Sequence, residues 1–359
     1  MDRLDDNTKT LLALQYVEEL ANKKKYALLD EVDEPCELCE AASKPIVQKI
    51  LGDHADEFFA NVAKIEAIAE NMQKREVHWL TYLDDDYPQT LCDVYDKPIV
   101  LFAKGNIDAL KMRIISVVGT RRPTRYGAKV AEDFSREYAR AGLCIASGLA
   151  RGVDGIAHKA CVDNSSPTIA VFASGLDVIY PAEHRGLVDG ILASGGLLLS
   201  EYPLGTKPLQ YHFPDRNRIV SGISEAVFLP QAAKKSGSLI TMRLAIEQGK
   251  EIFVTPGNVY DEENFGSNEL LREMPHALAI SPEDVLDALH VEREVIEKEP
   301  VQLDLVQSGI LDALHDGEKH FEELLAETGL SVADLTNVLF NLEIDGLVQK
   351  TAGNFYALP

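Results

Sequence analysis

The chain has 359 residues, of which 46% are hydrophobic, so two or three domains with a large core are expected and global disorder is excluded. No apolar run approaches the roughly 20 residues that span a bilayer, and the acidic start MDRLDDNTKT does not resemble a signal peptide, so we expect a soluble, cytoplasmic protein. The net charge of −23 divides into −8 for residues 1–70, −2 for residues 71–282 and −13 for residues 283–359, so any anion-binding surface should lie in the middle.

Residues 1–75 are predicted to form a small helical domain. Apolar residues recur at spacings of three and four in KTLLALQYVEELANK, CEAASKPIVQKIL and ADEFFANVAKIEAIAENMQKR, as they do on one face of a helix. This segment also holds the C-x-x-C pair of Cys36 and Cys39. No second pair or histidine lies at zinc-ligand spacing, and an odd total of five cysteines argues against a disulfide framework, so we predict no metal and no cofactor.

Residues 76–290 are predicted to form a Rossmann-like, doubly wound α/β domain with a mostly parallel sheet. Continuously apolar runs indicate strands buried on both faces, and helical patterns alternate with them. The expected strands are residues 114–118, 143–147, 168–174, 196–202, 225–230 and 251–257. Ligands of such sheets bind beyond the carboxyl ends of the strands. The polar loops expected at that edge are residues 119–127, 148–152, 203–218, 231–238 and 256–268.

Residues 291–302 are predicted to be a linker, and residues 303–359 a winged helix. Three amphipathic segments precede two short strands, LVQKT and FYAL, which AGN joins. The third helix, SVADLTNVLFNLEIDG, has several acids and no basic residue, and the hairpin offers only Lys350. Because phosphate repulsion opposes DNA binding by such a surface, we expect a protein-contact or regulatory role there.

The loop GTRRPTRYG is the first candidate ligand site. It follows a strand and opens a helix, where free backbone N–H groups and the helix dipole favour an anion. Gly119 allows close approach of the backbone, while Arg121 and Arg122 add forked donors that suit phosphate. The chain has neither G-x-G-x-x-G nor a Walker motif, so neither a dinucleotide nor a nucleoside triphosphate is specifically indicated. The alternative is a capped turn with surface arginines.

The motif SGLARGVDGIAH suggests a catalytic triad of Ser147, Asp154 and His158, which we reject. There is no G-x-S-x-G elbow, and Asp154 and His158 lie four apart on one face of a predicted helix. His158 is expected to be a packing residue, and Asp154 to interact favourably with the helix dipole. Gly148 is expected to keep the loop close to a ligand or to neighbouring backbone.

The stretch HFPDRNRIVSG places an aromatic ring beside two guanidinium groups. Phe213 with Arg216 and Arg218 supplies what an unpaired base and its phosphate need. An extended segment would aim both arginines to one side and Asn217 to the other. The alternative places Phe213 in the core and pairs the arginines with local acids such as Asp215 and Glu201. From this stretch alone, the two interpretations are equally supported.

The segment KKSGSLITM precedes another predicted helix. The residues at its start are Lys235, Ser236, Gly237 and Ser238. Ser236 or Ser238 can cap the helix, and the same N–H groups can hold a phosphate, so a cap alone and a cap with an anion site are both open. The long loop that follows the last strand is expected to end in a cap at Ser267 or Asn268.

Together these motifs resemble the DprA/Smf family of DNA-processing proteins. The family's patterns appear in order as GTRRPTRYG, SGLARGVDGIAH, GLDVIYP, SEYP, FPDRNRIV, SGSLIT, PGNV and GSNELL. The resemblance is strong over roughly residues 80–290 and moderate over the winged helix, whereas residues 1–75 match only in helical character. The chain departs from the family at Gln231, where an acid is usual, and at Pro275 and His276, which replace part of an R-x-G-A pattern.

The resemblance implies a non-catalytic homodimer. Such a protein binds single-stranded DNA without strong sequence preference, protects it, and helps load the RecA recombinase during natural transformation. Carried over to this chain, Gly119, Thr120 and Arg121 hold phosphate and Phe213 stacks on a base. The predicted nucleic-acid-binding set is completed by Arg122, Gly148, Arg216, Asn217, Arg218, Lys235, Ser236, Gly237 and Ser238. An arginine of the RNR segment can instead brace the loops, because a buried guanidinium organises neighbouring carbonyls.

Two other functions are the alternatives. A Rossmann-like nucleotide-processing enzyme of the phosphoribohydrolase type carries P-G-G-x-G-T with a catalytic glutamate downstream, and this chain has no P-G-G. A transcription regulator would use the winged helix, whose acidic charge disfavours DNA binding.

Overall fold

The computed structural model of the chain describes residues 4–17, 19–41, 44–291, 303–315, 317–344 and 346–358. The chain divides into two compact units, Met1–Glu292 and Arg293–Pro359. The predicted linker at residues 291–302 lies outside the described residues apart from Val291.

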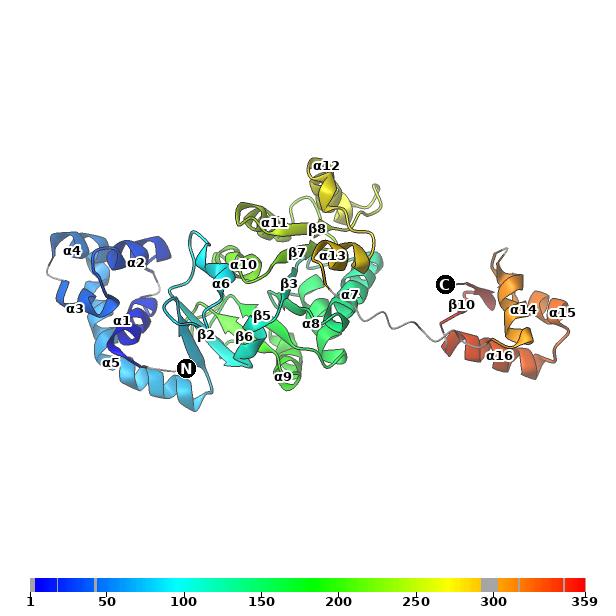
Figure 1. Cartoon of the computed structure of the whole chain (residues 1–359), viewed down its shortest axis with the longest axis horizontal. Helices are drawn as coiled ribbons and strands as arrows, with labels where there is room; N and C mark the ends of the chain where they lie inside the picture. The colour runs from blue at the N-terminus through cyan, green and yellow to red at the C-terminus, as the bar shows by residue number, and fades with distance from the viewer. Residues whose placement is uncertain are drawn as a thin grey trace. The chain divides into compact units, whose positions relative to one another are not determined.

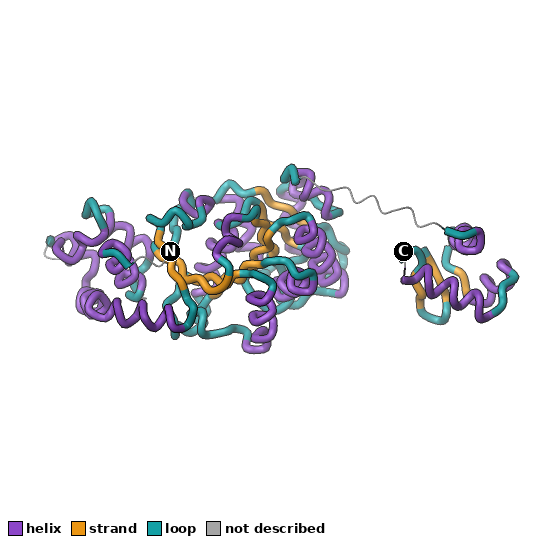
Figure 2. The backbone as a smooth tube through the Cα atoms, turned by 60° about the horizontal axis from the view of Figure 1, so that its bottom comes forward, coloured by secondary structure: helices purple, strands orange, loops and turns teal. Residues whose placement is uncertain are grey.

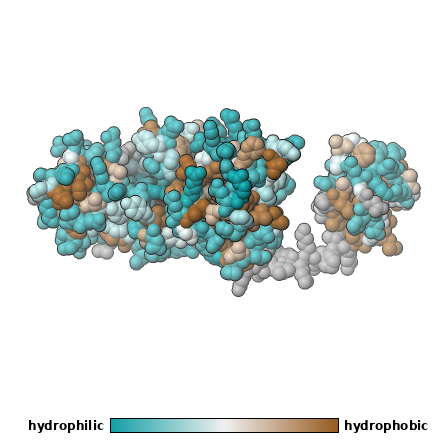
Figure 3. Space-filling model, turned by 90° about the horizontal axis from the view of Figure 1, so that it is seen from above, coloured by the Kyte–Doolittle hydropathy of each residue, from teal (hydrophilic) through white to brown (hydrophobic). Residues whose placement is uncertain are grey.

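No helix in these described ranges combines the length and the apolar character needed to cross a membrane. Hydrophilic side chains cover most of the face drawn in Figure 3, with scattered apolar patches.

The first unit begins with helices, as predicted. They are α1 (Asp6–Gln15), α2 (Asn22–Leu29), α3 (Leu38–Ala41), α4 (Pro45–Leu51) and α5 (Ala55–Lys74), with the 3-10 turns η1 (Pro35–Glu37) and η2 (Gly52–His54). Asp5 caps α1 by accepting a hydrogen bond from Thr8 N at 2.9 Å. The buried faces of α1 and α5 join a core that also includes Phe102 of the sheet, so the helical segment packs directly on the α/β part.

One eight-stranded sheet forms the centre of the first unit. Its strands are β1 (His78–Thr81), β2 (Val100–Gly105), β3 (Ile114–Val117), β4 (Cys144–Ser147), β5 (Thr168–Phe172), β6 (Leu197–Ser200), β7 (Ala226–Leu229) and β8 (Glu251–Val254). Their order across the sheet is β1-β2-β6-β5-β4-β3-β7-β8. The strands β3 to β8 are parallel, and β1 and β2 join one edge antiparallel. The six predicted strands are confirmed, whereas β1 and β2 were not predicted.

Helices cover both faces of this sheet, as its continuously apolar strands require. The elements are α6 (Gln89–Cys92), η3 (Ile107–Lys111), α7 (Arg125–Arg140), α8 (Val153–Asp163), η4 (Ala182–His184), α9 (Arg185–Ala193), α10 (His212–Gly222), α11 (Ser238–Glu247), η5 (Glu262–Asn264), α12 (Phe265–Glu273), η6 (Pro275–Ala277) and α13 (Pro282–Ala288). One core layer joins α7, α8 and α13 to the sheet, and another joins α6, α10 and α11 (Figure 1). Figure 2 shows the strands running between these helices.

The winding of the sheet reverses between β3 and β7. From β3 the chain moves outward through β4, β5 and β6, and then returns to β7 on the other side of β3. In open α/β sheets the loops diverge at such a switch point and leave a crevice beyond the carboxyl ends of the strands. The loops after β3 and β7 remain in contact at its floor, where Thr120 N donates to Gln231 O at 2.9 Å.

The second unit has the predicted winged-helix organisation of three helices and a hairpin. Its elements are α14 (Leu305–Leu314), β9 (Lys319–His320), α15 (Phe321–Thr328), α16 (Val332–Ile344), β10 (Gln349–Thr351) and β11 (Phe355–Ala357). The strand β9 pairs with β11 and was not predicted. Leu314, Leu324, Leu339 and Tyr356 fill a small core of its own.

Candidate nucleic-acid interface

A cleft of about 840 Å³ opens at the switch point between β3 and β7. Twelve of the thirteen predicted binding residues line it, and only Arg218 does not. The twelve are Gly119, Thr120, Arg121, Arg122, Gly148, Phe213, Arg216, Asn217, Lys235, Ser236, Gly237 and Ser238. The structure therefore brings four distant sequence motifs to one surface, at the edge of the sheet where ligands bind.

The loop after β3 is held on both sides by backbone contacts. At Gly119, a Cβ would lie 2.5 Å from the Val153 side chain, so only glycine lets the loop pack on the start of α8. Thr120 O accepts from Val153 N at 3.2 Å, while Thr120 N binds Gln231 O. The backbone is thus fixed, and the side chains of Arg121 and Arg122 that it carries are exposed.

Gln231, where the family usually has an acid, is fully buried and connects three loops. Its Oε1 accepts from Thr124 N at 2.9 Å, and its Nε2 donates to Asn264 Oδ1 at 2.7 Å. Thr124 in turn caps α7 by accepting from Gly127 N. A carboxylate at residue 231 has no N–H to donate, so the neutral amide fits both of these partners.

Phe213 lies on the wall of the cleft and outside the hydrophobic core. Its ring centre is 5.6 Å from that of Tyr180, at an interplanar angle of 64°. The guanidinium carbon of Arg121 lies 5.3 Å from the centre of the same ring, within the range of a cation–π contact. Phe213 is partly exposed, so its predicted alternative place in the core is wrong, whereas the pairing of an arginine with Glu201 in the same interpretation is confirmed for Arg218. Tyr180 was not predicted, although it belongs to the GLDVIYP motif that carries the resemblance.

The RNR segment is helical, so its predicted geometry as an extended loop is wrong. Residues 212–222 form α10, and positions two apart on an α-helix point about 200° from each other. Arg216 and Arg218 therefore face opposite sides of α10, whereas an extended segment would aim them the same way. The expected polar loop of residues 203–218 accordingly ends where α10 begins.

Arg216 braces the floor of the cleft. Its side chain is only 3% exposed, and its Nη1 donates to the carbonyls of Gly148 and Val171. Asp154, beside it, accepts from Gly148 N at 3.1 Å and Ala150 N at 3.3 Å. Burial lowers the pKa of Arg216 to about 10 and raises that of Asp154, while the opposite charge of each partner opposes the shift. Arg216 thus stays cationic at neutral pH and supplies positive charge beneath the cleft.

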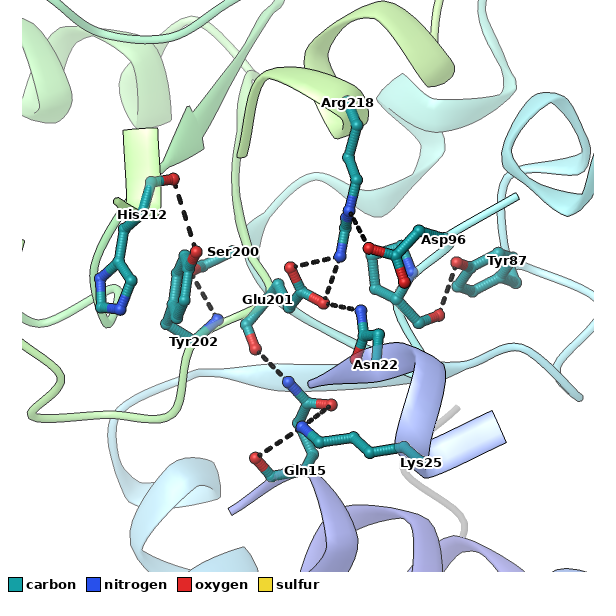
Figure 4. Close-up of polar contacts among 11 residues, drawn as sticks. Gln15, Asn22, Lys25, Tyr87, Asp96, Ser200, Glu201, Tyr202, His212 and Arg218 are labelled. Carbon is teal, nitrogen blue, oxygen red and sulfur yellow. Dashed lines mark hydrogen bonds and ion pairs between the residues drawn. The ribbon is translucent and has the colours of Figure 1, made fainter. Parts of the chain in front are cut away.

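The prediction that Arg218 contacts nucleic acid is not supported by its position. The side chain is buried away from the cleft, and its Nη2 donates to both carboxylate oxygens of Glu201, at 2.7 and 2.8 Å. Its Nε lies 3.4 Å from Asp96 Oδ2. Glu201 also accepts from Asn22 of α2, and its carbonyl accepts from Gln15 Nε2 (Figure 4). Arg218 therefore anchors α10 to β6 and to the helical segment.

Neither Ser236 nor Ser238 is the N-cap residue of α11, so that prediction is wrong, although Ser236 Oγ accepts from Ser238 N at 3.4 Å. The helix begins at Ser238 with Gly237 as its N-cap residue. The hydroxyls of Ser236 and Ser238 instead pair with each other at 2.7 Å. Lys235 beside them is exposed. This leaves the positive end of α11 directed at the cleft beside a lysine, an arrangement that suits an anion.

The side chains of Ser147, Asp154 and His158 form their hydrogen bonds with other groups and not with one another, which agrees with the rejection of the triad. Ser147 Oγ donates to Val117 O at 2.6 Å, and His158 Nδ1 lies 2.8 Å from Thr168 Oγ1. Burial lowers the pKa of His158 to about 3, so its ring is neutral at neutral pH. His158 is the packing residue that was predicted.

The loop after β8 differs from the prediction in its cap. The helix α12 starts after Asn264, while Ser267 Oγ accepts from Ala232 N and Asn268 exchanges two hydrogen bonds with Gly257, each 3.1 Å long. The departure at Pro275 and His276 forms the 3-10 turn η6. Within the described part of the chain, no three His, Cys, Asp or Glu side chains could hold a metal ion, and Cys36 and Cys39 are free thiols.

Residues 78–290 match the family model described as DNA recombination-mediator protein A. The chain belongs to the DprA/Smf family. Residues 297–354 match a second model, the DprA winged helix domain, which agrees with the fold of the second unit.

Curated relatives agree with this assignment. The chain is 41% identical over 251 residues to DNA processing protein DprA of Bacillus subtilis (strain 168), covering 70% of this chain and 82% of that protein. It is 34% identical to Protein Smf of Escherichia coli (strain K12), covering 78% of each. It is 44% identical to DprA of Streptococcus pneumoniae, covering 57% of this chain and 71% of the relative.

Two solved structures share the fold. The X-ray structure of DprA from Streptococcus pneumoniae matches with a TM-score of 0.66 at 34% identity, over 79% of this chain and 98% of that one. DNA processing protein A from Helicobacter pylori, described for its single-stranded DNA binding mode, matches with a TM-score of 0.54 at 33% identity. That match covers 60% of this chain and 96% of the Helicobacter chain.

Proposed function

We propose that this DprA/Smf protein binds single-stranded DNA in the cleft between β3 and β7. One observation carries the proposal: a cationic phosphate loop, an exposed helix N-terminus and a partly exposed aromatic ring line a single open cleft. The Helicobacter pylori relative, described for its binding of single-stranded DNA, supports the same ligand class.

Each wall of the cleft has a role in this proposal. The backbone N–H of Gly119 and the hydroxyl of Thr120, with Arg121, hold one phosphate, and the start of α11 with Lys235 holds another. A base stacks on Phe213, which contributes about 1–3 kcal/mol per base in comparable complexes. Contacts to phosphates and to the face of a base do not distinguish the four bases, so we propose binding without strong sequence preference.

We place this activity in the cytoplasm, a reducing compartment in which the five cysteines remain free thiols. We further propose that the protein is a homodimer that protects incoming strands and helps load the RecA recombinase onto them in natural transformation. Relatives named as DNA processing proteins in Bacillus subtilis and Streptococcus pneumoniae support this setting. Two clefts in one dimer could hold one strand, which raises avidity without new contacts.

The alternative is a nucleotide-processing enzyme that uses a carboxylate of the cleft. Asp154 is bound by two backbone N–H groups, which leaves Glu263 as the accessible acid among the lining residues. The test is to titrate fluorescent oligo-dT from roughly 50 to 200 mM salt while assaying nucleotide turnover in parallel. Tight, salt-sensitive binding without turnover supports the proposal. Turnover that a single carboxylate substitution abolishes would replace it with the enzyme.

A further inference from the structure

Glu263 introduces a negative charge into a cleft that otherwise suits anions. The exposed charged side chains lining the cleft include Arg121, Arg122 and Lys235. Asp154 also lines it, but this residue is only 8% exposed and its carboxylate accepts from two backbone N–H groups. Glu263 is half-buried, so its carboxylate is within reach of any anion that enters.

The position of Glu263 is fixed by its own short turn. It lies in the 3-10 turn η5, where its N–H donates to Asp261 Oδ1 at 3.0 Å. The next residue, Asn264, is buried and accepts a hydrogen bond from Gln231, in the loop after β7. These hydrogen bonds hold the backbone of Glu263 in its turn and, through Asn264, tie that turn to the loop after β7.

The carboxylate of Glu263 accepts a hydrogen bond from the hydroxyl of Thr120. Thr120 Oγ1 donates to Glu263 Oε2 at 3.2 Å and accepts from Arg122 N at 3.2 Å. A threonine hydroxyl has one hydrogen to donate, so this donor is already used in the free protein. A phosphate oxygen that binds the Thr120 hydroxyl must displace the carboxylate of Glu263. Until the carboxylate is displaced, its negative charge repels the phosphate.

We propose that Glu263 is a specificity-determining residue of the cleft, because its carboxylate occupies the place of a phosphate oxygen on Thr120. This inference rests on the proposed function and deepens it. An isolated phosphate anion gains contacts only with the loop after β3 and the start of α11. Competition from the Glu263 carboxylate therefore removes much of the affinity of that anion. A DNA strand also gains stacking on Phe213 and contacts from further phosphates, so it still binds, and it is released more readily than from a purely cationic cleft.

The test compares three variants of the full chain by fluorescence anisotropy with oligo-dT. Glu263→Gln removes the charge but keeps an acceptor for Thr120, whereas Glu263→Ala removes both. Glu262→Gln is the matched control, because Glu262 belongs to the same turn, is exposed, and does not line the cleft. We expect Glu263→Gln to bind about 3- to 10-fold more tightly at low salt, Glu263→Ala at least as tightly, and Glu262→Gln within about two-fold of wild type.

The salt dependence separates this role from a structural one. Removing a carboxylate that opposes one phosphate should raise the magnitude of the salt slope by up to about 0.7. In a Thr120→Val background the gain from Glu263→Ala should shrink, because the contested hydroxyl is gone. Affinities and slopes of both Glu263 variants that equal those of Glu262→Gln, or weaker binding by either, would overturn the inference.

Failure of the proposed function gives a different result. If folded wild type does not bind oligo-dT at any salt concentration, the proposed function fails. Calorimetric titration with sodium tripolyphosphate then probes the anion site without DNA. A gain in tripolyphosphate affinity for Glu263→Gln over Glu262→Gln supports the competition at Thr120, and equal affinities overturn it.

Discussion

The guanidinium of Arg218 and the carboxylate of Glu201 form a buried ion pair behind the cleft, with Arg218 Nη2 2.7 and 2.8 Å from the two oxygens. Both side chains are less than 10% exposed, and Asn22 donates to the same carboxylate (Figure 4). The pair therefore joins α10, the end of β6 and the helical segment. Because α10 also carries Phe213 and Arg216, this junction helps to fix one wall of the cleft.

Arg218→Ala is expected to act on stability and not on the electrostatics of binding. Removing one partner leaves the Glu201 charge buried and uncompensated, which costs about 3–5 kcal/mol in comparable pairs. Urea unfolding should show this loss, while the salt slope of oligo-dT binding by the folded variant stays that of wild type. Glu201→Gln is the control and should also lower the free energy of unfolding. Unchanged stability together with a shallower salt slope would show that Arg218 contacts DNA, as the sequence predicted.

Phe213→Ala tests the stacking wall. The substitution should weaken oligo-dT binding by about 1–3 kcal/mol, that is about 5- to 150-fold, with little change in the salt slope. Its Tm should stay close to that of wild type, because the ring lies outside the core. Tyr260→Ala is the matched control, since Tyr260 is 91% exposed and does not line the cleft. A Phe213→Ala variant that unfolds would restore the core interpretation.

Arg121→Ala tests the phosphate loop. Loss of one cation at a phosphate should weaken binding and reduce the magnitude of the salt slope by about 0.7, the value for single strands. Part of the effect passes through Phe213, because the guanidinium lies over its ring. Arg140→Ala removes the same charge at the far end of α7, and it should leave both quantities unchanged. Equal slopes for the two variants would exclude Arg121 from the phosphate site.

The sequence predicted the sheet well where local signals are strong. The continuously apolar strands β3 to β8 are visible in any short window, whereas β1 has four residues and pairs with β2, which reaches the parallel strands only through β6. The helix α10 was mistaken for a loop because of Pro214 and its polar neighbours. Pro214 lies in the first turn of α10, where its missing N–H would have no helical partner.

The residues of the candidate site were predicted from the order of the motifs. The hydrogen bonds that connect the loops of the site were not predicted. Thr120, Gln231 and Glu263 come from three loops that no local pattern links, and their hydrogen bonds depend on the final packing. The assignment of Arg218 failed for a simpler reason. Residues two apart point the same way in an extended segment and opposite ways in a helix. Because α10 was taken for an extended loop, Arg218 was assigned to the side of the cleft together with Arg216.

His158 should make stability depend on pH. Thr168 Oγ1 donates its hydrogen to Ile145 O, so His158 Nδ1 carries the ring proton, and Nε2 is buried without a partner among the described residues. Burial lowers the pKa to about 3 in the folded state. The unfolded chain, with an ordinary pKa near 6.5, then binds more protons between these values, so stability falls as pH falls through this window.

The size of this effect can be measured by urea unfolding at pH 6.5 and pH 5.0. Wild type should lose up to about 2 kcal/mol more of its unfolding free energy over this interval than His158→Gln, which has no titrating group at the position. Comparing the two chains cancels the contributions of the other titrating groups. Parallel pH profiles would mean that the imidazole accepts a proton in the folded state without penalty.

Removal of the second unit should leave DNA binding largely intact. The helix α16 is the element that a winged helix presents to DNA, and its sequence holds Asp334 and Glu343 but no basic residue. Two apolar side chains, Val332 and Phe340, are 59% and 60% exposed on it, which suits a protein contact better than a phosphate backbone. Deleting residues 300–359 should therefore change oligo-dT affinity by less than about ten-fold, and a larger loss would show that this unit contacts the strand.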